Sequence, residues 1–149
     1  MSGAGASRAG APLLRRRFPA RAGELRAVRE AVRREALAQG CAPDCADDVV
    51  MAVDEACQNI IRHAYAGRSD GEIVLEIERS GEELLVSLRD FAPPVDPSRV
   101  RPRDLDDLRP GGLGTHLIRE LMDGADFAPV PPGGGNLFRM SKRIRKETG

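Results

Sequence analysis

The sequence predicts a two-layer α/β sandwich, in which helices cover one face of a mixed, mostly antiparallel sheet. Segments 71–79 and 82–90 alternate apolar and polar residues, as half-buried strands do, and the Ser80-Gly81 pair between them suits a hairpin turn. Segments 22–39 and 44–65 instead repeat apolar residues with the period of a helix that buries one face. Because each element has one apolar face, the stable arrangement is one helical layer on one sheet.

The remaining elements follow from the same two periodicities. We expect a short strand, a third helix and two closing strands at 13–18, 113–124, 126–130 and 136–144. Segment 96–112 is rich in Pro, Arg and Asp without helical periodicity, and a loop of this kind in a compact domain is usually functional or disordered. Residues 1–12 have the composition of a flexible segment, so residues 13–149 are predicted to form a single domain.

Charge is balanced overall but distributed unevenly. The 149 residues include 23 basic and 23 acidic side chains, yet nine arginines and only three glutamates fall within the first 40 positions. Five of these arginines alternate with apolar residues in a helical pattern, so we interpret this basic region as a solvated helix face or a partner surface rather than a nucleic-acid site. They are Arg21, Arg26, Arg29, Arg33 and Arg34. The scarcity of aromatic residues also argues against binding of single-stranded nucleic acid.

The N-terminal residues contain no apolar run of signal-peptide or membrane-spanning length, so we expect a cytoplasmic protein that does not bind a membrane.

Cys41 and Cys45 have no paired Cys or His cluster downstream, which disfavours a zinc site. Cys57 falls on an apolar helix stripe and is expected in the core. An odd number of cysteines without an export signal predicts reduced thiols.

The segment DDVVMAVDEACQNIIRHAY places two chemically useful side chains on its polar face. Glu55 and Asn59 are four residues apart, so they are neighbours on a helix and can act on one ion or one water molecule. An Asn oxygen is a hard ligand that Mg²⁺ accepts alongside phosphate and water, and a Glu beside it can accept a proton. A solvated helix face without a ligand explains the same pair and is the more frequent outcome for this spacing.

Two further segments contain groups suited to a nucleotide. Gly111, Gly112 and Gly114 precede an apolar helical series, and the amides of such a helix start can bind phosphate, although a helix start without a ligand is more frequent. The turn is not a Walker loop, because no Gly-Lys-Ser/Thr follows it. Asp90 ends a predicted strand, where its carboxylate could accept a hydrogen bond from the amine of adenine or could cap the turn before the prolines.

Taken in order, these segments resemble the ATP-binding domain shared by gyrase, Hsp90, histidine kinases and MutL. The most similar branch is that of the bacterial anti-sigma factor serine kinases. The resemblance extends from about Leu13 to Ile144 and rests on EACQNIIRHAY, Asp90, GLG and the closing GGGNLFRMSKRI. It implies a Bergerat-type ATP-binding fold, ATP and Mg²⁺ as cofactors, and transfer of phosphate to a serine of a small STAS-type antagonist protein. It also implies a homodimer that sequesters a sigma factor.

The resemblance implies a role for each residue of the first two boxes. Glu55 corresponds to the general base and Asn59 to the magnesium ligand. Asp90 corresponds to the residue that accepts a hydrogen bond from the adenine amine. His63 and Tyr65 correspond to neighbours typical of the family, and we expect His63 beside the nucleotide.

The remaining roles fall on the lid and the second glycine box. Gly112, Leu113 and Gly114 correspond to the backbone that binds the phosphates, and Thr115 follows where many relatives have Leu. In the family, segment 96–112 corresponds to the ATP lid, so one of its arginines could reach the γ-phosphate. Arg109 is favoured because it lies near the glycines, although pairing of the lid arginines with the neighbouring aspartates is an equal alternative.

The chain departs from the family in the loop after Asp90, where Ala92 and Pro94 replace glycines. Proline fixes φ and removes an amide donor, so this loop is expected to be rearranged. An alternative function is therefore a nucleotide-sensing binding module without kinase activity. A second alternative, phosphotransfer through His63 or His116 in a two-component relay, is disfavoured because no dimerisation or receiver segment is present.

Overall fold

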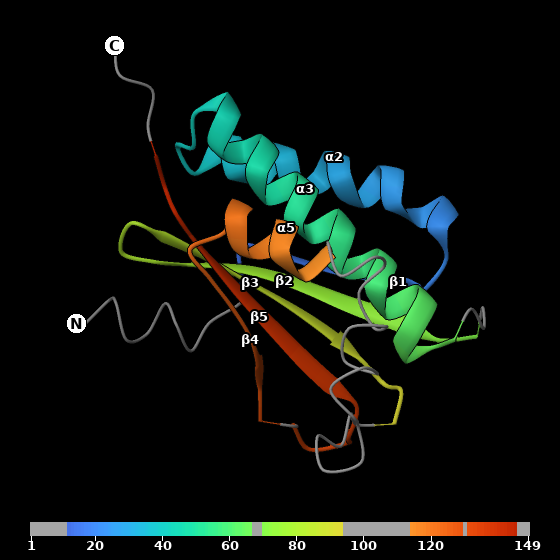
Figure 1. The fold of residues 1–149 in the computed structure, drawn as a ribbon. Helices are drawn as coiled ribbons and strands as arrows, with labels where there is room; N and C mark the ends of the chain where they lie inside the picture. The colour runs from blue at the N-terminus through green and yellow to red at the C-terminus, as the bar shows by residue number, and fades with distance from the viewer. Residues whose placement is uncertain (1–11, 67–69, 94–113, 130, 146–149) are drawn as a thin grey trace.

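The computed structural model describes residues 12–66, 70–93, 114–129 and 131–145. Within them, one five-stranded sheet carries the helices on one face, which confirms the two-layer α/β sandwich (Figure 1). The strands are β1 (Leu14–Pro19), β2 (Glu72–Ser80), β3 (Glu83–Asp90), β4 (Gly124–Ala128) and β5 (Asn136–Arg143). They lie in the order β1-β2-β3-β5-β4, and the expected mostly antiparallel sheet is antiparallel in every described pair.

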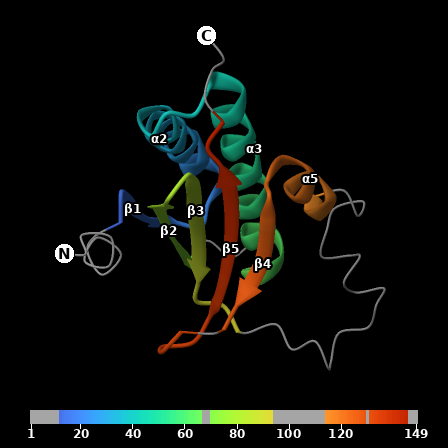
Figure 2. The ribbon, with the colours of Figure 1, turned by 90° about the vertical axis from the view of Figure 1, so that its left-hand side faces the viewer.

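The helical layer has α3 at its centre. Its elements are η1 (Ala22–Glu24), α2 (Leu25–Ala38), α3 (Pro43–Asn59), η2 (Ile60–Ala64) and α5 (Gly114–Leu121). In Figure 2, α3 lies between α2 and α5 and packs against both. Pro43 occupies the start of α3, where its fixed φ suits a helix and its missing amide donor costs nothing.

The core fills the space between the two layers. On the sheet side, alternate residues of β2 and β3 point to the helices, and on the helix side the apolar stripes of α2 and α3 face the sheet. The buried residues include Val28, Val32, Val49, Val53, Cys57, Ile73, Leu75, Ile77, Leu84, Val86 and Leu88. Burial of one such aliphatic side chain stabilises the fold by about 1.5–3 kcal/mol. The prediction of Cys57 as a core residue is confirmed.

The last turn of the helix expected at 44–65 is π-helical. The Tyr65 amide donates to the carbonyl of Ile60, five residues earlier, at 3.0 Å, whereas an α-helix uses the fourth residue. This segment is η2, which begins directly after Asn59. The regular α-helical spacing used for Glu55 and Asn59 therefore holds up to Asn59 and changes for the residues that follow.

The boundaries near the C-terminus also differ from those expected. The helix expected at 113–124 ends at Leu121, and β4 begins at Gly124 instead of at residue 126. The Asp123 amide donates to the Ser141 carbonyl at 2.9 Å, so pairing with β5 starts directly after the helix. Long-range pairing thus shortens a segment that local periodicity alone would continue as a helix.

The basic face of α2 is only partly free for solvent or a partner. Arg29 forms an ion pair with Asp54 of α3 at 2.9 Å, and Arg33 forms one with Asp47. Part of the N-terminal positive charge therefore joins α2 to α3.

One buried charge joins β5 to two helices. The side chain of Lys142 is 2% exposed, and its Nζ donates to Asp48 Oδ2 of α3 at 3.1 Å and to the carbonyl of Leu121, the last residue of α5. Arg145 donates to the same Asp48 oxygen at 3.1 Å. A cation at the C-terminus of α5 also interacts favourably with the helix dipole. Asp48, placed by its periodicity on the polar helix face, thus contacts a buried lysine.

Two expected features lie outside the described residues. These are the N-terminal segment 1–12, apart from Pro12, and the lid segment 96–112. Among the helices of the described part of the chain, none has the length and apolar character needed to cross a membrane.

Candidate functional site

Glu55, Asn59 and Arg62 form one polar group on the α3–η2 segment. Glu55 is 20% exposed, and Asn59 is half-buried. Arg62 Nη2 lies 3.8 Å from Glu55 Oε2 and donates to Asn59 Oδ1 at 3.4 Å. The sequence predicts the first two as site residues, and the structure adds the guanidinium of Arg62 to them. The signal for Arg62 was its position on the same polar helix face, three residues after Asn59.

Asp90 lies at the end of β3 and faces the helical layer. It continues the inward row of Leu84, Val86 and Leu88, and it is 3% exposed. Its Oδ1 accepts hydrogen bonds from the Ala92 amide and from Asn136 Nδ2, both at 3.0 Å, whereas Oδ2 accepts none from the described residues. Burial raises the pKa of Asp90, and the two hydrogen bonds oppose that rise. A carboxylate oxygen that has no donor among the described residues, on a side chain this little exposed, is suited to accept an N–H from a ligand.

The loop after Asp90 keeps its amide contact although Ala92 replaces a family glycine. The bond from the Ala92 amide to Asp90 Oδ1 closes an Asx turn, in which a side chain bonds the backbone two residues on. Among described non-glycine residues, positive φ occurs at Ala66 and not at Ala92. Ala92 therefore does not require the conformational freedom of glycine. Pro94, the other departure, lies outside the described residues.

Asn136 and Gly135 complete the surroundings of Asp90, and the sequence analysis missed both. Asn136 is the direct cross-strand partner of Asp90 in the β3–β5 pair. Gly135 has φ of 90°, and a Cβ at this position would lie 2.0 Å from the Asp90 carbonyl oxygen, so only glycine fits. Three consecutive glycines before an Asn signalled a close backbone approach, but not which residue is approached.

Tyr65 connects the helix that carries Glu55 and Asn59 to the Asp90 loop. Its hydroxyl donates to the Glu72 carbonyl at 2.6 Å and accepts the Phe91 amide at 2.7 Å. Its ring lies against Gly71, where a Cβ would be 2.4 Å from a ring carbon. The structure therefore brings the end of the α3–η2 segment to the residue that follows Asp90.

His63 lies on η2 and is half-buried. Its Nε2 is buried and has no hydrogen-bond partner among the described residues. Burial, and then the charge of Arg62, lower the pKa of His63, so its imidazole is neutral near pH 7. The predicted place of His63 beside a nucleotide remains a prediction.

The predicted phosphate site lies at the start of α5. This helix begins at Gly114, and Thr115 is its second residue. Phosphate binding by its first backbone amides remains a prediction. Gly112, Leu113 and Arg109 lie outside the described residues.

Comparison with known proteins identifies the family. Residues 18–142 match the histidine kinase-like ATPase domain. The chain belongs to this family. A similar curated protein, serine-protein kinase RsbW of Staphylococcus aureus, is 32% identical over 117 residues, which cover 72% of each chain.

Other relatives agree with this assignment. Serine-protein kinase RsbW of Listeria innocua is 34% identical over 92 residues, which cover 56% of this chain and 59% of that protein. The match to this relative thus spans less than two thirds of its length. The crystal structure of the RsbU and RsbW domains of a Mycobacterium tuberculosis protein aligns with a TM-score of 0.58 and 20% identity, covering 91% of this chain and 34% of the other. This structural likeness supports the histidine kinase-like fold.

A histidine kinase-like ATPase domain implies a nucleotide, and the described residues fit one. Asp90 Oδ2 provides an acceptor that has no donor among the described residues, which suits an amine of a base. Asn59 is half-buried, and among the described residues its Oδ1 accepts only a long 3.4 Å hydrogen bond from Arg62. Such an oxygen suits Mg²⁺, which takes few protein ligands and keeps phosphate and water as the others.

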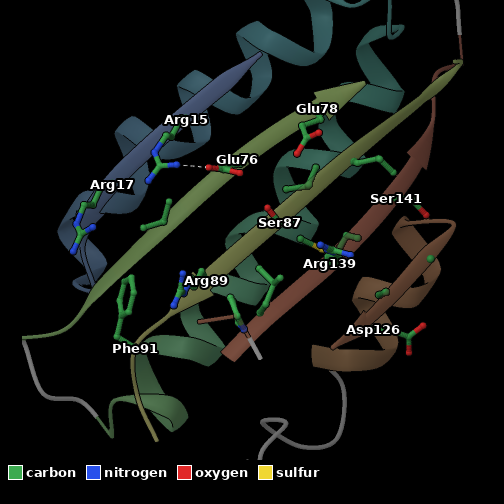
Figure 3. A pocket seen from close by; sticks show the side chains of 18 residues that line it. Arg15, Arg17, Glu76, Glu78, Ser87, Arg89, Phe91, Asp126, Arg139 and Ser141 are labelled. Carbon is green, nitrogen blue, oxygen red and sulfur yellow. Dashed lines mark hydrogen bonds and ion pairs between the residues drawn. The ribbon is translucent and has the colours of Figure 1, made fainter. Parts of the chain in front are cut away.

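A separate hollow lies on the uncovered face of the sheet (Figure 3). Its volume is ≈ 770 Å³, and outward-facing residues of the strands line it, among them Arg15, Glu76, Ser87 and Arg139. Since these side chains alternate with those of the core, the hollow faces away from α3. It contains none of the residues predicted for the nucleotide, so the candidate site of this histidine kinase-like domain is on the helical side of the sheet.

Proposed function

We propose that the chain is a Mg²⁺- and ATP-dependent protein serine kinase that phosphorylates a small STAS-type antagonist protein. The observation that carries this proposal is the Tyr65 hydroxyl, which bonds the Phe91 amide and thereby links the segment of Glu55 and Asn59 to the buried Asp90. A proton acceptor, a metal-ligating oxygen and a buried base acceptor thus belong to one connected part of the fold. The names of the RsbW relatives as serine-protein kinases support the reaction class.

In the proposed reaction each side chain has one task. Asp90 Oδ2 accepts a hydrogen bond from the adenine amine, and Asn59 Oδ1 holds Mg²⁺. When bound, Mg²⁺ supplies the positive charge that offsets charge on the phosphates. The first amides of α5 orient the phosphates through their N–H groups. Glu55 accepts the proton of the acceptor serine as the serine oxygen bonds to the γ-phosphorus of ATP, while the bond from that phosphorus to the bridging oxygen breaks and ADP leaves.

The proposal extends to the partners and the cellular setting. The chain acts as a cytoplasmic anti-sigma factor that sequesters a sigma factor as a homodimer, and phosphorylation of the antagonist controls release. Residues 13–149 form its one ATP-binding domain. Neither nucleic acid nor a membrane takes part directly.

The alternative is a nucleotide-sensing module without kinase activity. It is favoured by one observation, the contact of Arg62 with Glu55, because a carboxylate that contacts a guanidinium is less available to a serine hydroxyl. Calorimetric titration with ATP and Mg²⁺, followed by incubation of labelled ATP with STAS-type proteins, separates the two functions. Labelled phosphoserine on such a protein supports the kinase. Binding without transfer to any antagonist supports the module, and absence of ATP binding contradicts both.

Asn59→Ala is expected to weaken Mg²⁺-dependent ATP binding roughly 10- to 100-fold, the range typical of disturbing the surroundings of a bound metal. The fold should be unaffected because Asn59 is only half-buried on the polar side of α3. Calorimetry with and without Mg²⁺ measures the effect. Gln39→Ala is the matched control, because Gln39 has the same type of amide group but lies at the end of α2, where it donates to Glu35 at 2.8 Å. Equal ATP affinity in the wild type and Asn59→Ala would remove Asn59 from the site.

Asp90→Asn is expected to weaken ATP roughly 10- to 100-fold, since a hydrogen bond to a charged group contributes about 1.5–3 kcal/mol. The two donors on Oδ1 will hold the single oxygen of the new amide, so its NH₂ will stand at the Oδ2 position and oppose the adenine amine. The same NH₂ could donate to the carbonyl of guanine, so the ratio of GTP to ATP affinity should rise. Titration with both nucleotides tests this, and an unchanged ratio with unchanged ATP affinity would show that adenine is recognised elsewhere.

A further inference from the structure

One guanidinium group contacts every polar side chain on the last turn of the α3 site face. Arg62 Nη1 donates to Gln58 Oε1 at 3.4 Å, and Nη2 donates to Asn59 Oδ1 at 3.4 Å and lies 3.8 Å from Glu55 Oε2. The π-turn that starts after Asn59 is the segment that carries Arg62. The oxygens predicted for Mg²⁺ and for the proton thus have a cation beside them.

These contacts are long for a guanidinium. Hydrogen bonds from N–H to oxygen are usually 2.7–3.2 Å, and the neighbouring pair between Arg29 and Asp54 measures 2.9 Å. The two ion pairs have the same exposure, with 44% for each arginine and 20% for each carboxylate. Exposure therefore does not explain why Arg62 is held more loosely than Arg29. Arg62 makes three weak contacts instead of one short one, so a stronger cation can displace it.

A bound Mg²⁺ cannot leave Arg62 where it is. Mg²⁺ lies about 2.0–2.1 Å from its ligand oxygens, so a metal on Asn59 Oδ1 would stand close to a guanidinium that donates to the same atom. Two cations at that separation repel each other, and the oxygen would lose electron density to both. Glu55, the one carboxylate in contact with Arg62, attracts whichever cation remains.

We infer that Arg62 is the resident counter-ion of Glu55 and Asn59 and competes with Mg²⁺ for them, so that loading the site displaces the Arg62 side chain. This inference rests on the proposed function. As a consequence, the site needs a higher Mg²⁺ concentration for half-maximal nucleotide binding than the oxygens of Glu55 and Asn59 would need without Arg62. Binding of Mg²⁺ without nucleotide is disfavoured by repulsion from Arg62. Mg²⁺ that arrives with the phosphates of the nucleotide binds, because their negative charge offsets this repulsion.

The test measures the Mg²⁺ concentration that gives half-maximal binding of a non-hydrolysable ATP analogue. Arg62→Gln should lower this concentration roughly three- to tenfold, because one nearby positive charge, partly screened by salt, is removed. Arg62→Lys keeps the charge and should stay nearer to the wild type. Arg29→Gln is the matched control, since it removes an equally exposed charge from the pair with Asp54, and its magnesium requirement should equal that of the wild type.

A second readout needs no nucleotide. In a titration with Mg²⁺ alone, the side-chain amide resonance of Asn59 should shift at lower Mg²⁺ in Arg62→Gln than in the wild type. A magnesium requirement in Arg62→Gln equal to or above that of the wild type would overturn the inference while leaving the proposed function intact. Wild-type nucleotide binding that does not respond to Mg²⁺ would overturn the proposed function, and the inference with it.

Discussion

Glu55→Gln is expected to keep ATP bound and to slow phosphate transfer roughly 10²- to 10⁴-fold, the usual contribution of a general base. This corresponds to about 3–5 kcal/mol of activation free energy. Gln has nearly the shape of Glu but cannot accept the serine proton, so the ATP affinity at saturating Mg²⁺ should change little. Single-turnover transfer of labelled phosphate to the antagonist protein, together with calorimetric ATP affinity, separates the two effects.

Asp54→Asn is the matched control for Glu55→Gln. Asp54 is the preceding carboxylate on the same helix, with the same 20% exposure, but it pairs with Arg29 and accepts from Gln58. Loss of this charge should leave the transfer rate within a few-fold of the wild type. Equal rates in Glu55→Gln and the wild type would show that Glu55 is not the base, and equal losses in both variants would indicate a general charge effect.

Lys142→Ala is expected to have the largest effect on stability, a loss of about 3–5 kcal/mol in the free energy of unfolding. The change removes a side chain that is 2% exposed and leaves a cavity between β5 and the helices. It also deprives Asp48 and the Leu121 carbonyl of their shared donor. Urea unfolding of the purified variants measures the difference.

Two further variants divide that loss into its parts. Lys142→Met keeps the buried stem but removes the ammonium, so it should cost about 1–3 kcal/mol, the penalty of leaving polar partners unsatisfied. Arg145→Ala removes the other partner of Asp48, but Arg145 is 54% exposed, so the loss should stay below about 1 kcal/mol. Stability of Lys142→Met equal to that of the wild type would mean that the lysine contributes only its aliphatic packing.

Much of the site could be predicted because its residues are local. Glu55 and Asn59 lie on one α-helix, where a spacing of four residues decides that they are neighbours. Asp90 follows Leu84, Val86 and Leu88 at a spacing of two, so the strand pattern alone places it on the inner face. Arg62 lies three residues after Asn59 on the same polar face, so its contact with Asn59 is also local, whereas its approach to Glu55, seven residues earlier, appears only in the structure.

The sequence by itself determined the two layers, the polar face of α3 and the inward direction of Asp90, because helix and strand periods are properties of neighbouring residues. Only the tertiary structure decided which distant residues meet. Asn136 reaches Asp90 across 46 positions through the β3–β5 register, and Lys142 reaches Asp48 across 94. The physical reason is that strand register and helix docking depend on packing of the whole core, and many partner choices are compatible with the same local pattern.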